Sequence, residues 1–161
     1  MTYEISRDSR DAFPPLQIGV LLRFSLEEVR KRIYEGVVAA GFDDVRPAHV
    51  TLFRWPGPDG ARPTEVAAAV QRSKQTVNDL LRDLERLGYL ELEPDPTDNR
   101  ARIIHLTERG KRLHKIAVGV HARIEREWAQ IVGEGCFQQL RETLSHVVAV
   151  TSDRAAARPA S

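Results

Sequence analysis

The hydrophobic pattern of the chain is clearest between Ser73 and Thr107, where it changes from a helical to an extended period. Apolar side chains recur at three- and four-residue intervals in the first half of this stretch, which places them on one helix face. They are Val77, Leu80, Leu81, Leu84 and Leu87. Ser73 is a suitable N-cap, and Gly88 a suitable end, since glycine accepts the left-handed conformation without a Cβ clash. The pattern predicts a helix over about 73–88 with a buried apolar face.

Beyond that glycine the pattern alternates, which predicts the two strands of a β-hairpin. Residues 89–93 alternate apolar and acidic side chains, and residues 101–106 form a second extended run. Between them lies PDPTDNR, whose two prolines and Asp-Asn pair favour a loop over a strand. We therefore expect the hairpin tip to carry Arg100, with Arg102 just behind it, and Thr107 to cap the next helix.

Elsewhere the apolar spacing is helical, and the first and last helices are apolar enough to need a partner surface. Pro63 suits the first turn of a helix, because the missing N–H of proline would be unpaired there. The predicted helices cover about 14–40, 46–54, 63–70, 108–132 and 137–148.

A helix with a polar leading turn, followed at once by a basic-tipped hairpin, is the order of a winged helix-turn-helix. The segment SKQTVNDLLRDLERLGYLELEPDPTDNRARIIHLTERG resembles the recognition helix and wing of the MarR family of transcriptional regulators. Asp98 and Arg100, followed by Leu106-Thr107 and Gly110, match the wing signature of that family. The close match covers about 65–113, and beyond it only the helical pattern agrees.

The resemblance implies a mainly α fold with a small β-hairpin wing, in which a winged helix-turn-helix lobe is joined to N- and C-terminal dimerisation helices. It also implies a homodimer that binds a palindromic operator in double-stranded DNA, most often as a repressor that responds to a small molecule. The expected boundaries are a flexible segment 1–13, one MarR-like domain 14–151 with the lobe at 46–106 and dimerisation helices at 14–41 and 107–150, and a disordered tail 152–161.

The recognition helix of such a fold enters the major groove by its N-terminal end. The amides of Gln75 and Asn78 can read adenine, while Arg82 or Lys74 can bind guanine or phosphate. Asp79 and Asp83 would repel DNA unless they pair with arginines three residues further on. The expected DNA contacts are Ser73, Lys74, Gln75, Thr76, Asn78, Arg82, Asp98, Arg100 and Arg102.

At the wing, we expect Arg100 to enter the narrow minor groove, where negative potential is concentrated. Asp98 either orients this guanidinium or shapes the loop as an Asx turn. Arg102 is a second contact or a surface strand residue. The turn before the recognition helix departs from the family, because Gln71 replaces the usual glycine and Arg72 the usual apolar residue. A side chain in a left-handed turn costs about 1 kcal/mol.

The composition of the chain says less about fold and function than its hydrophobic pattern does. The chain has 161 residues, 29% charged and 42% hydrophobic, which fits one globular domain. A net charge of +1 does not by itself indicate nucleic acid. There is no apolar run of membrane-spanning length, no signal-like N-terminus and one cysteine, Cys136, so we expect a cytoplasmic protein without a membrane partner.

Candidate ligand residues lie where the resemblance implies an effector pocket, between the dimerisation helices and the lobe. They are Trp55 and His49, with a core or hinge role as the alternative for Trp55. We expect no cofactor and no metal, since His114 and His121 with nearby Glu125 are a poor ligand set.

Three rival interpretations remain. An enzyme lacks support, because no nucleotide-binding glycine loop, Gly-x-Ser-x-Gly or His-Glu-x-x-His motif is present in the sequence. A thiol-sensing regulator would use Cys136, which lies near the start of the last predicted helix. A winged helix used only for protein contacts would require an acidic or apolar recognition face, which this sequence does not predict.

Overall fold

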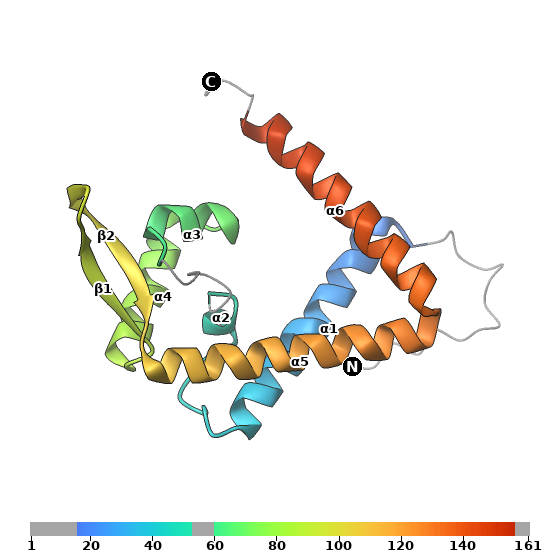
Figure 1. Ribbon diagram of the computed structural model, residues 1–161, viewed down its shortest axis with the longest axis horizontal. Helices are drawn as coiled ribbons and strands as arrows, with labels where there is room; N and C mark the ends of the chain where they lie inside the picture. Colours follow the sequence, from blue (N-terminus) through green and yellow to red (C-terminus); the bar gives the residue numbers. More distant parts are fainter. Residues whose placement is uncertain (1–15, 53–59, 157–161) are drawn as a thin grey trace.

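The computed structural model describes residues 16–52 and 60–156, and within these ranges the chain is helical apart from one β-hairpin (Figure 1). The predicted mainly α fold with a hairpin wing is confirmed. In chain order the elements are α1 (Ile18–Ala39), α2 (Pro47–Val50), α3 (Pro63–Ala69), α4 (Lys74–Arg86), β1 (Leu90–Asp95), β2 (Asp98–Leu106), α5 (Glu108–Val132) and α6 (Glu134–Ala156).

Helix α5 connects the two halves of the molecule, since it begins at the base of the hairpin, crosses and packs against α1, and ends at the start of α6 (Figure 1). Its apolar positions Val120 and Ile124 are buried together with Ile33 and Val37 of α1. Gly36 lies against Val120 with no room for a Cβ, so the glycine permits this close approach. The N-terminal half of α1 and most of α6 remain uncovered.

The lobe consists of α2, α3, α4 and the hairpin around a continuous apolar core. The predicted inner face of α4 is confirmed, with Val77, Leu81 and Leu84 buried. These side chains lie in one cluster with residues of α3, the hairpin and α5, namely Val66, Ala67, Leu90, Ile104 and Leu113. Helix α4 is therefore packed on its inner side against α3, the hairpin and α5.

The hairpin is antiparallel, with Leu90 opposite Leu106 and Leu92 opposite Ile104. Ala61 adds an isolated bridge to Ile104, in which each backbone N–H donates to the carbonyl of the other residue at 2.9 and 3.2 Å. The hairpin is thus joined at mid-length to the segment that leads into α3.

The hairpin corrects the predicted loop over residues 94–100, because β1 continues to Asp95 and β2 starts at Asp98. Pro94 is accommodated opposite Arg102 because each strand of a two-stranded sheet has a free edge, where a missing N–H costs no ladder bond. A register shift at Pro94/Asp95 marks the irregularity that the proline introduces.

Other predicted boundaries need smaller corrections. The short helix expected over 46–54 is confined to α2, and α6 continues to Ala156, into the predicted tail 152–161. Its last turns contain alanine and arginine, which favour a helix without any apolar pattern. The segment 1–13 lies outside the described residues. None of the helices in the described ranges is both long and apolar enough to cross a membrane.

Buried Tyr89 joins the lobe to the rest of the molecule. Its hydroxyl donates to Asp44, and the guanidinium of Arg109 lies 4.4 Å from its ring centre and donates to Asp44 at 2.8 Å. Burial, together with the bond to Asp44, raises the pKa of Tyr89 well above its ordinary value. Gly110 lies directly beneath the Tyr89 carbonyl, where any Cβ would overlap the oxygen.

We predict that Gly110→Ala lowers the free energy of unfolding by about 1–3 kcal/mol, because the methyl group would displace the backbone at Tyr89. Gly119→Ala is the matched control, since it makes the same change in α5 with nothing within 4 Å of the new atom. It should stabilise by about 0.5–1 kcal/mol. Chemical denaturation of both variants at one protein concentration measures the difference, and equal effects would contradict this view of Gly110.

Candidate nucleic-acid interface

The leading end of α4 presents an exposed polar face. Ser73 caps the helix as predicted, with its hydroxyl oxygen accepting from the backbone N–H of Thr76 at 3.1 Å and lying 2.8 Å from the Thr76 hydroxyl. These two hydroxyls are thus already engaged in the cap. The structure brings six of the predicted DNA contacts together on this exposed surface: Ser73, Lys74, Gln75, Thr76, Asn78 and Arg82.

Asp79 and Asp83 of α4 are paired with arginines as the sequence predicts. Arg82 lies 3.7 Å from Asp79, and Arg86 lies 3.5 Å from Asp83. Asp83 is also bound by Arg46, which precedes α2. The negative charge on this helix is therefore partly compensated before any DNA is bound.

The turn between α3 and α4 has the conformation expected from the sequence. Gln71 has a φ of +52°, in the left-handed region that favours glycine. Arg72 is exposed beside it. The turn is therefore preserved despite the missing glycine, and Arg72 is exposed to solvent.

The wing lies on the same lobe, with Asp98 and Arg102 exposed on β2. Arg102 donates to the carbonyl of Leu92 at 3.4 Å, across the hairpin. Arg100 lies in β2, close to the turn, and its side chain is outside the described residues. Whether Asp98 orients Arg100 therefore stays a prediction.

An ion pair between the wing and α3 was missed by the sequence analysis. Oδ2 of Asp95 accepts from Nε of Arg62 at 2.8 Å and lies 2.6 Å from Nη2. Oδ1 accepts from the backbone N–H and the hydroxyl of Thr97 at 2.8 and 2.6 Å. These bonds from Thr97 and Arg62 lower the pKa of Asp95 to about 2. The two partners are 33 positions apart, so no local pattern could have paired them.

A second unpredicted cluster ties α2 to the back of α4. His49 is 1% exposed, and its Nδ1 accepts from the backbone N–H of Arg46 at 3.2 Å. Its Nε2 lies 3.7 Å from Asp83, which Arg46 also binds. Burial and the positive charges of Arg46 and Arg86 hold the pKa of His49 below its ordinary value of 6.5.

This geometry changes the interpretation of His49 as a ligand residue. A ring that is 1% exposed and bonded on its polar atoms has little surface to offer a ligand. Trp55, the other candidate, lies outside the described residues.

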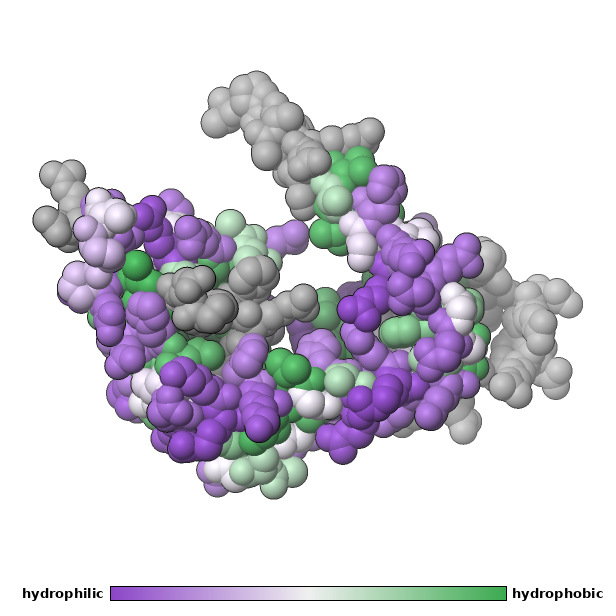
Figure 2. Space-filling model, viewed as in Figure 1, coloured by the Kyte–Doolittle hydropathy of each residue, from purple (hydrophilic) through white to green (hydrophobic). Residues whose placement is uncertain are grey.

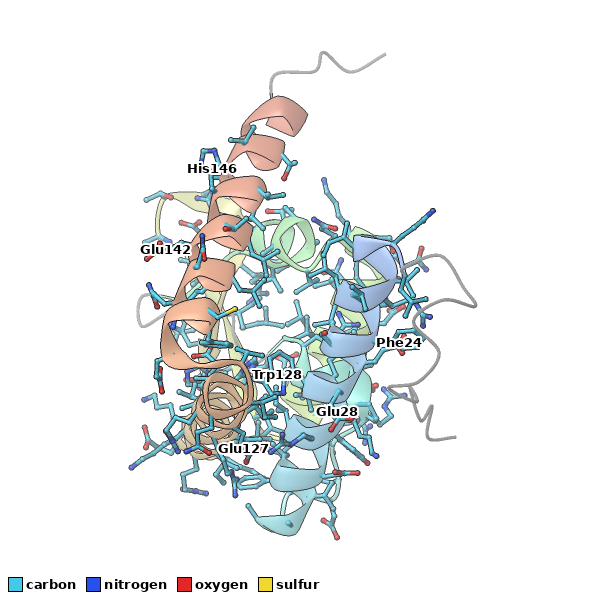
Figure 3. The ribbon with its side chains drawn as sticks, turned by 90° about the vertical axis from the view of Figure 1, so that its right-hand side faces the viewer. Phe24, Glu28, Glu127, Trp128, Glu142 and His146 are labelled. Atoms are coloured by element: carbon cyan, nitrogen blue, oxygen red, sulfur yellow. The ribbon has the colours of Figure 1, made fainter. Side chains whose placement is uncertain are left out.

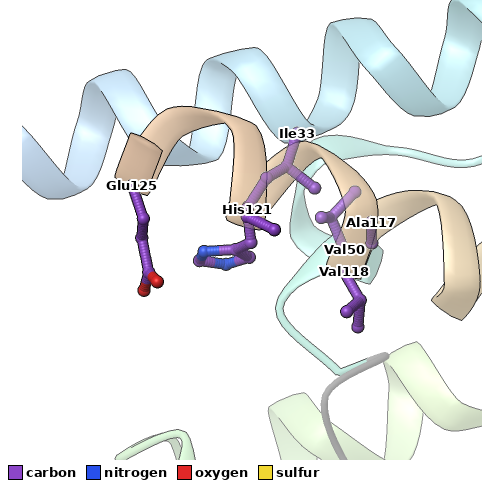
Figure 4. A pocket seen from close by; sticks show the side chains of 7 residues that line it. Ile33, Val50, Ala117, Val118, His121 and Glu125 are labelled. Carbon is purple, nitrogen blue, oxygen red and sulfur yellow. The ribbon is translucent and has the colours of Figure 1, made fainter. Parts of the chain in front are cut away.

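Two hollows meet where α1, α2 and α5 converge, and both are lined by Ile33, Val50 and His121. One, of about 340 Å³, extends along α5 to Glu125, and Figure 4 shows the His121 ring and the Glu125 carboxylate facing the same open side. The other, of about 380 Å³, extends to the turn before α4 and includes Arg30 and Arg72.

A third, more apolar groove of about 470 Å³ lies between α1, α5 and α6. Trp128 lies between α1 and the start of α6, with Phe24 and Glu28 on α1 (Figure 3). Apolar side chains toward the end of α6 are exposed, whereas the surface of the hairpin is mostly hydrophilic (Figure 2). Val148, for example, is 63% exposed, and Ile18 at the start of α1 is 66% exposed. Cys136 of α6 is exposed as well.

Comparison with known proteins supports the resemblance seen in the sequence. The model of the MarR family matches residues 56–101. No sequence among curated proteins matches the chain. The crystal structure of MarR is 25% identical, with a TM-score of 0.69 over 88% of this chain and 95% of that one.

Two further structures share the fold at lower identity. A MepR–DNA complex from S. aureus is 23% identical, with a TM-score of 0.65 over 84% of this chain and 98% of that one. FabT from Streptococcus pneumoniae, in complex with DNA, is 22% identical, with a TM-score of 0.67 over 84% of this chain and 96% of that one.

The lowered pKa of His49 predicts a pH-dependent stability. As pH falls below about 6.5, the His49 imidazole is protonated in the unfolded chain while it stays neutral in the folded chain. The free energy of unfolding therefore falls by at most about 1.4 kcal/mol per pH unit. In His49→Asn the amide oxygen can still accept from Arg46, but nothing titrates. Denaturation between pH 7 and 5 should therefore give a flatter profile for the variant, and parallel profiles would contradict the assignment.

Proposed function

The chain belongs to the MarR family, and from this premise we propose that it is a transcriptional repressor that binds a palindromic operator as a homodimer and releases it when a small molecule binds. That it is a DNA-binding transcriptional regulator, and not an enzyme, follows from the family. The observation that carries the proposal is the exposed polar end of α4 beside a hydrophilic wing on one packed lobe.

In this proposal the leading end of α4 enters the major groove and the wing reaches the neighbouring minor groove. Gln75 and Asn78 contact base edges, while Lys74 and Arg82 contact bases or phosphates. Arg100 and Arg102 act from the wing. The face is polar and basic at these positions, which favours DNA over the rival interpretation as a module for protein contacts.

The uncovered apolar surface of α1 and α6 supports the proposed homodimer. A water-exposed set of side chains as large as Ile18, Leu22, Leu140 and Val148 favours burial against a second copy. A twofold dimer places two lobes at a fixed spacing and so matches two half-sites of a palindrome. One lobe alone offers too few contacts for selective binding.

The hollow beside Arg30 and Arg72 is the effector site that we favour. It combines an apolar wall, including Val29, Ile33 and Val50, with two guanidinium groups, so it suits an organic anion with an apolar body. Val50 adjoins His49, which contacts Asp83 of the recognition helix. A ligand that displaces α2 would therefore disturb α4 through bonds that already exist.

The DNA-binding proposal predicts a retarded band when the purified protein meets fragments of DNA flanking its own gene, or a sequence selected from a random pool. Arg100→Ala should weaken binding roughly tenfold or more, because it removes the proposed minor-groove contact. Arg126→Ala, which removes an equal charge from an exposed site on α5, is the control. No retardation by a folded protein at low salt, against either DNA, would contradict the proposal.

The effector proposal predicts that some members of a panel of aliphatic and aromatic carboxylates release the DNA. Arg30→Gln should raise the concentration needed for release without changing DNA affinity, because Arg30 lines the hollow on α1. Lys31→Gln is the control, since Lys31 is exposed beside it and pairs with Glu35. Equal response of the two variants to every active compound would place the effector elsewhere.

A further inference from the structure

The wing has few connections to the lobe along its length. A two-stranded hairpin is marginally stable by itself, so its direction must be set by what it touches. At its base, Tyr89 and Thr107 are joined by a backbone bond of 3.1 Å, and at mid-length Ile104 bonds to Ala61. Toward the turn, Arg62 at the start of α3 forms an ion pair with Asp95 and also donates to the Thr97 hydroxyl at 3.3 Å.

In this ion pair, here called the wing clasp, other hydrogen bonds fix the position of each partner. The Asp95 side chain is 3% exposed, and its two oxygens are divided between Arg62 on one side and Thr97 on the other. Arg62 is itself fixed, because it is the N-cap residue of α3 and its backbone N–H donates to Glu65 at 2.9 Å. The clasp therefore joins the last residue of β1 to the N-cap residue of α3.

The clasp has a direct geometric consequence for the proposed DNA contacts. Helix α3 packs against α4, so a wing held by α3 is also held at a set distance from the recognition helix. Strand β2, which carries Arg100 and Arg102, starts three positions after Asp95. Two elements that enter neighbouring grooves at once must keep this distance, or one contact is made at the expense of the other.

We propose that Arg62 and Asp95 are positioning residues for DNA binding, which hold the wing in the orientation that lets its arginines reach the minor groove while α4 occupies the major groove. This inference rests on the proposed function. Neither residue has to touch DNA. Asp95, as a carboxylate, would repel DNA if it acted alone.

The direction in which one substitution changes DNA affinity distinguishes a positioning role from a purely electrostatic one. Asp95→Asn removes a negative charge and should strengthen DNA binding if only charge mattered. The amide oxygen can still accept from Thr97 and keep the turn, but its NH₂ group would face the guanidinium of Arg62. Positioning predicts the opposite, namely that Asp95→Asn weakens binding to the operator by about tenfold.

Three companion variants complete the experiment. Arg62→Gln should weaken binding to a similar degree, and the double variant by no more than either single one, because both changes break the same link. Glu91→Gln is the matched control, since it neutralises an exposed carboxylate on the same strand and should leave binding equal or stronger. Thermal unfolding of each variant verifies that the lobe is folded.

The effect of Arg100→Ala on DNA affinity, compared between wild type and Asp95→Asn, is a measurement that a mere loss of stability would not change. In the Asp95→Asn background, Arg100→Ala should cost much less than in the wild type, and footprinting should show weaker minor-groove protection with the major-groove protection retained. If Asp95→Asn binds as well as or better than wild type, or if Arg100→Ala costs the same in both backgrounds, the clasp has no positioning role. A wild-type protein that binds no DNA would instead refute the proposed function.

Discussion

The close packing around Tyr89 is the constraint on which the rest of the structure depends. This buried ring lies where the loop after α1, the end of α4, the start of β1 and the first turn of α5 meet. The guanidinium of Arg109 stacks on the ring and also donates to Asp44 and to the carbonyl of Leu87. This one side chain therefore links α5 to the loop after α1, to the end of α4 and to Tyr89. Because Gly110 allows the α5 backbone to touch the Tyr89 carbonyl, the long helix starts in contact with the lobe.

That junction explains how a small lobe can act as one body. The apolar face of α4 packs into the core, and Asp83 of α4 contacts Arg46 and His49 beside α2. The wing is linked to α3, which packs against α4, by the wing clasp. The last two links are polar and partly exposed, so they can be broken and remade more easily than the core. The structure thus combines an apolar interior with polar links between α4, α2, α3 and the hairpin, the elements that carry or support the proposed DNA contacts.

Local patterns in the sequence were sufficient for the helix α4, its Ser73 cap, its buried face and its acid–arginine pairs, since each depends on residues within one or two turns. The left-handed turn at Gln71 was also predictable, because its position between two helices is more informative than its residue type. The family resemblance supplied the fold around them.

Sequence patterns did not predict the features that depend on contacts between residues far apart in the chain. The prolines of the hairpin suggested a long loop, but pairing with β2 extends the strand to Asp95. The polar pairs Arg62–Asp95 and Arg46–Asp83 link positions 33 and 37 residues apart, and no periodicity reports such contacts. The sequence also did not indicate that His49 is buried with its Nε2 3.7 Å from Asp83 of α4, a contact between residues far apart in the chain.

The central claim, that the polar face of α4 and the wing bind DNA, is tested most directly by the salt dependence of affinity for the selected operator. Each phosphate that the protein neutralises releases counterions, so the logarithm of the association constant should fall linearly with the logarithm of salt concentration, with a slope near −0.9 per phosphate contact. A steep negative slope that becomes shallower in Arg100→Ala is the predicted result. Binding that is independent of salt, or confined to a protein partner, would contradict the account and favour a winged helix used for protein contacts.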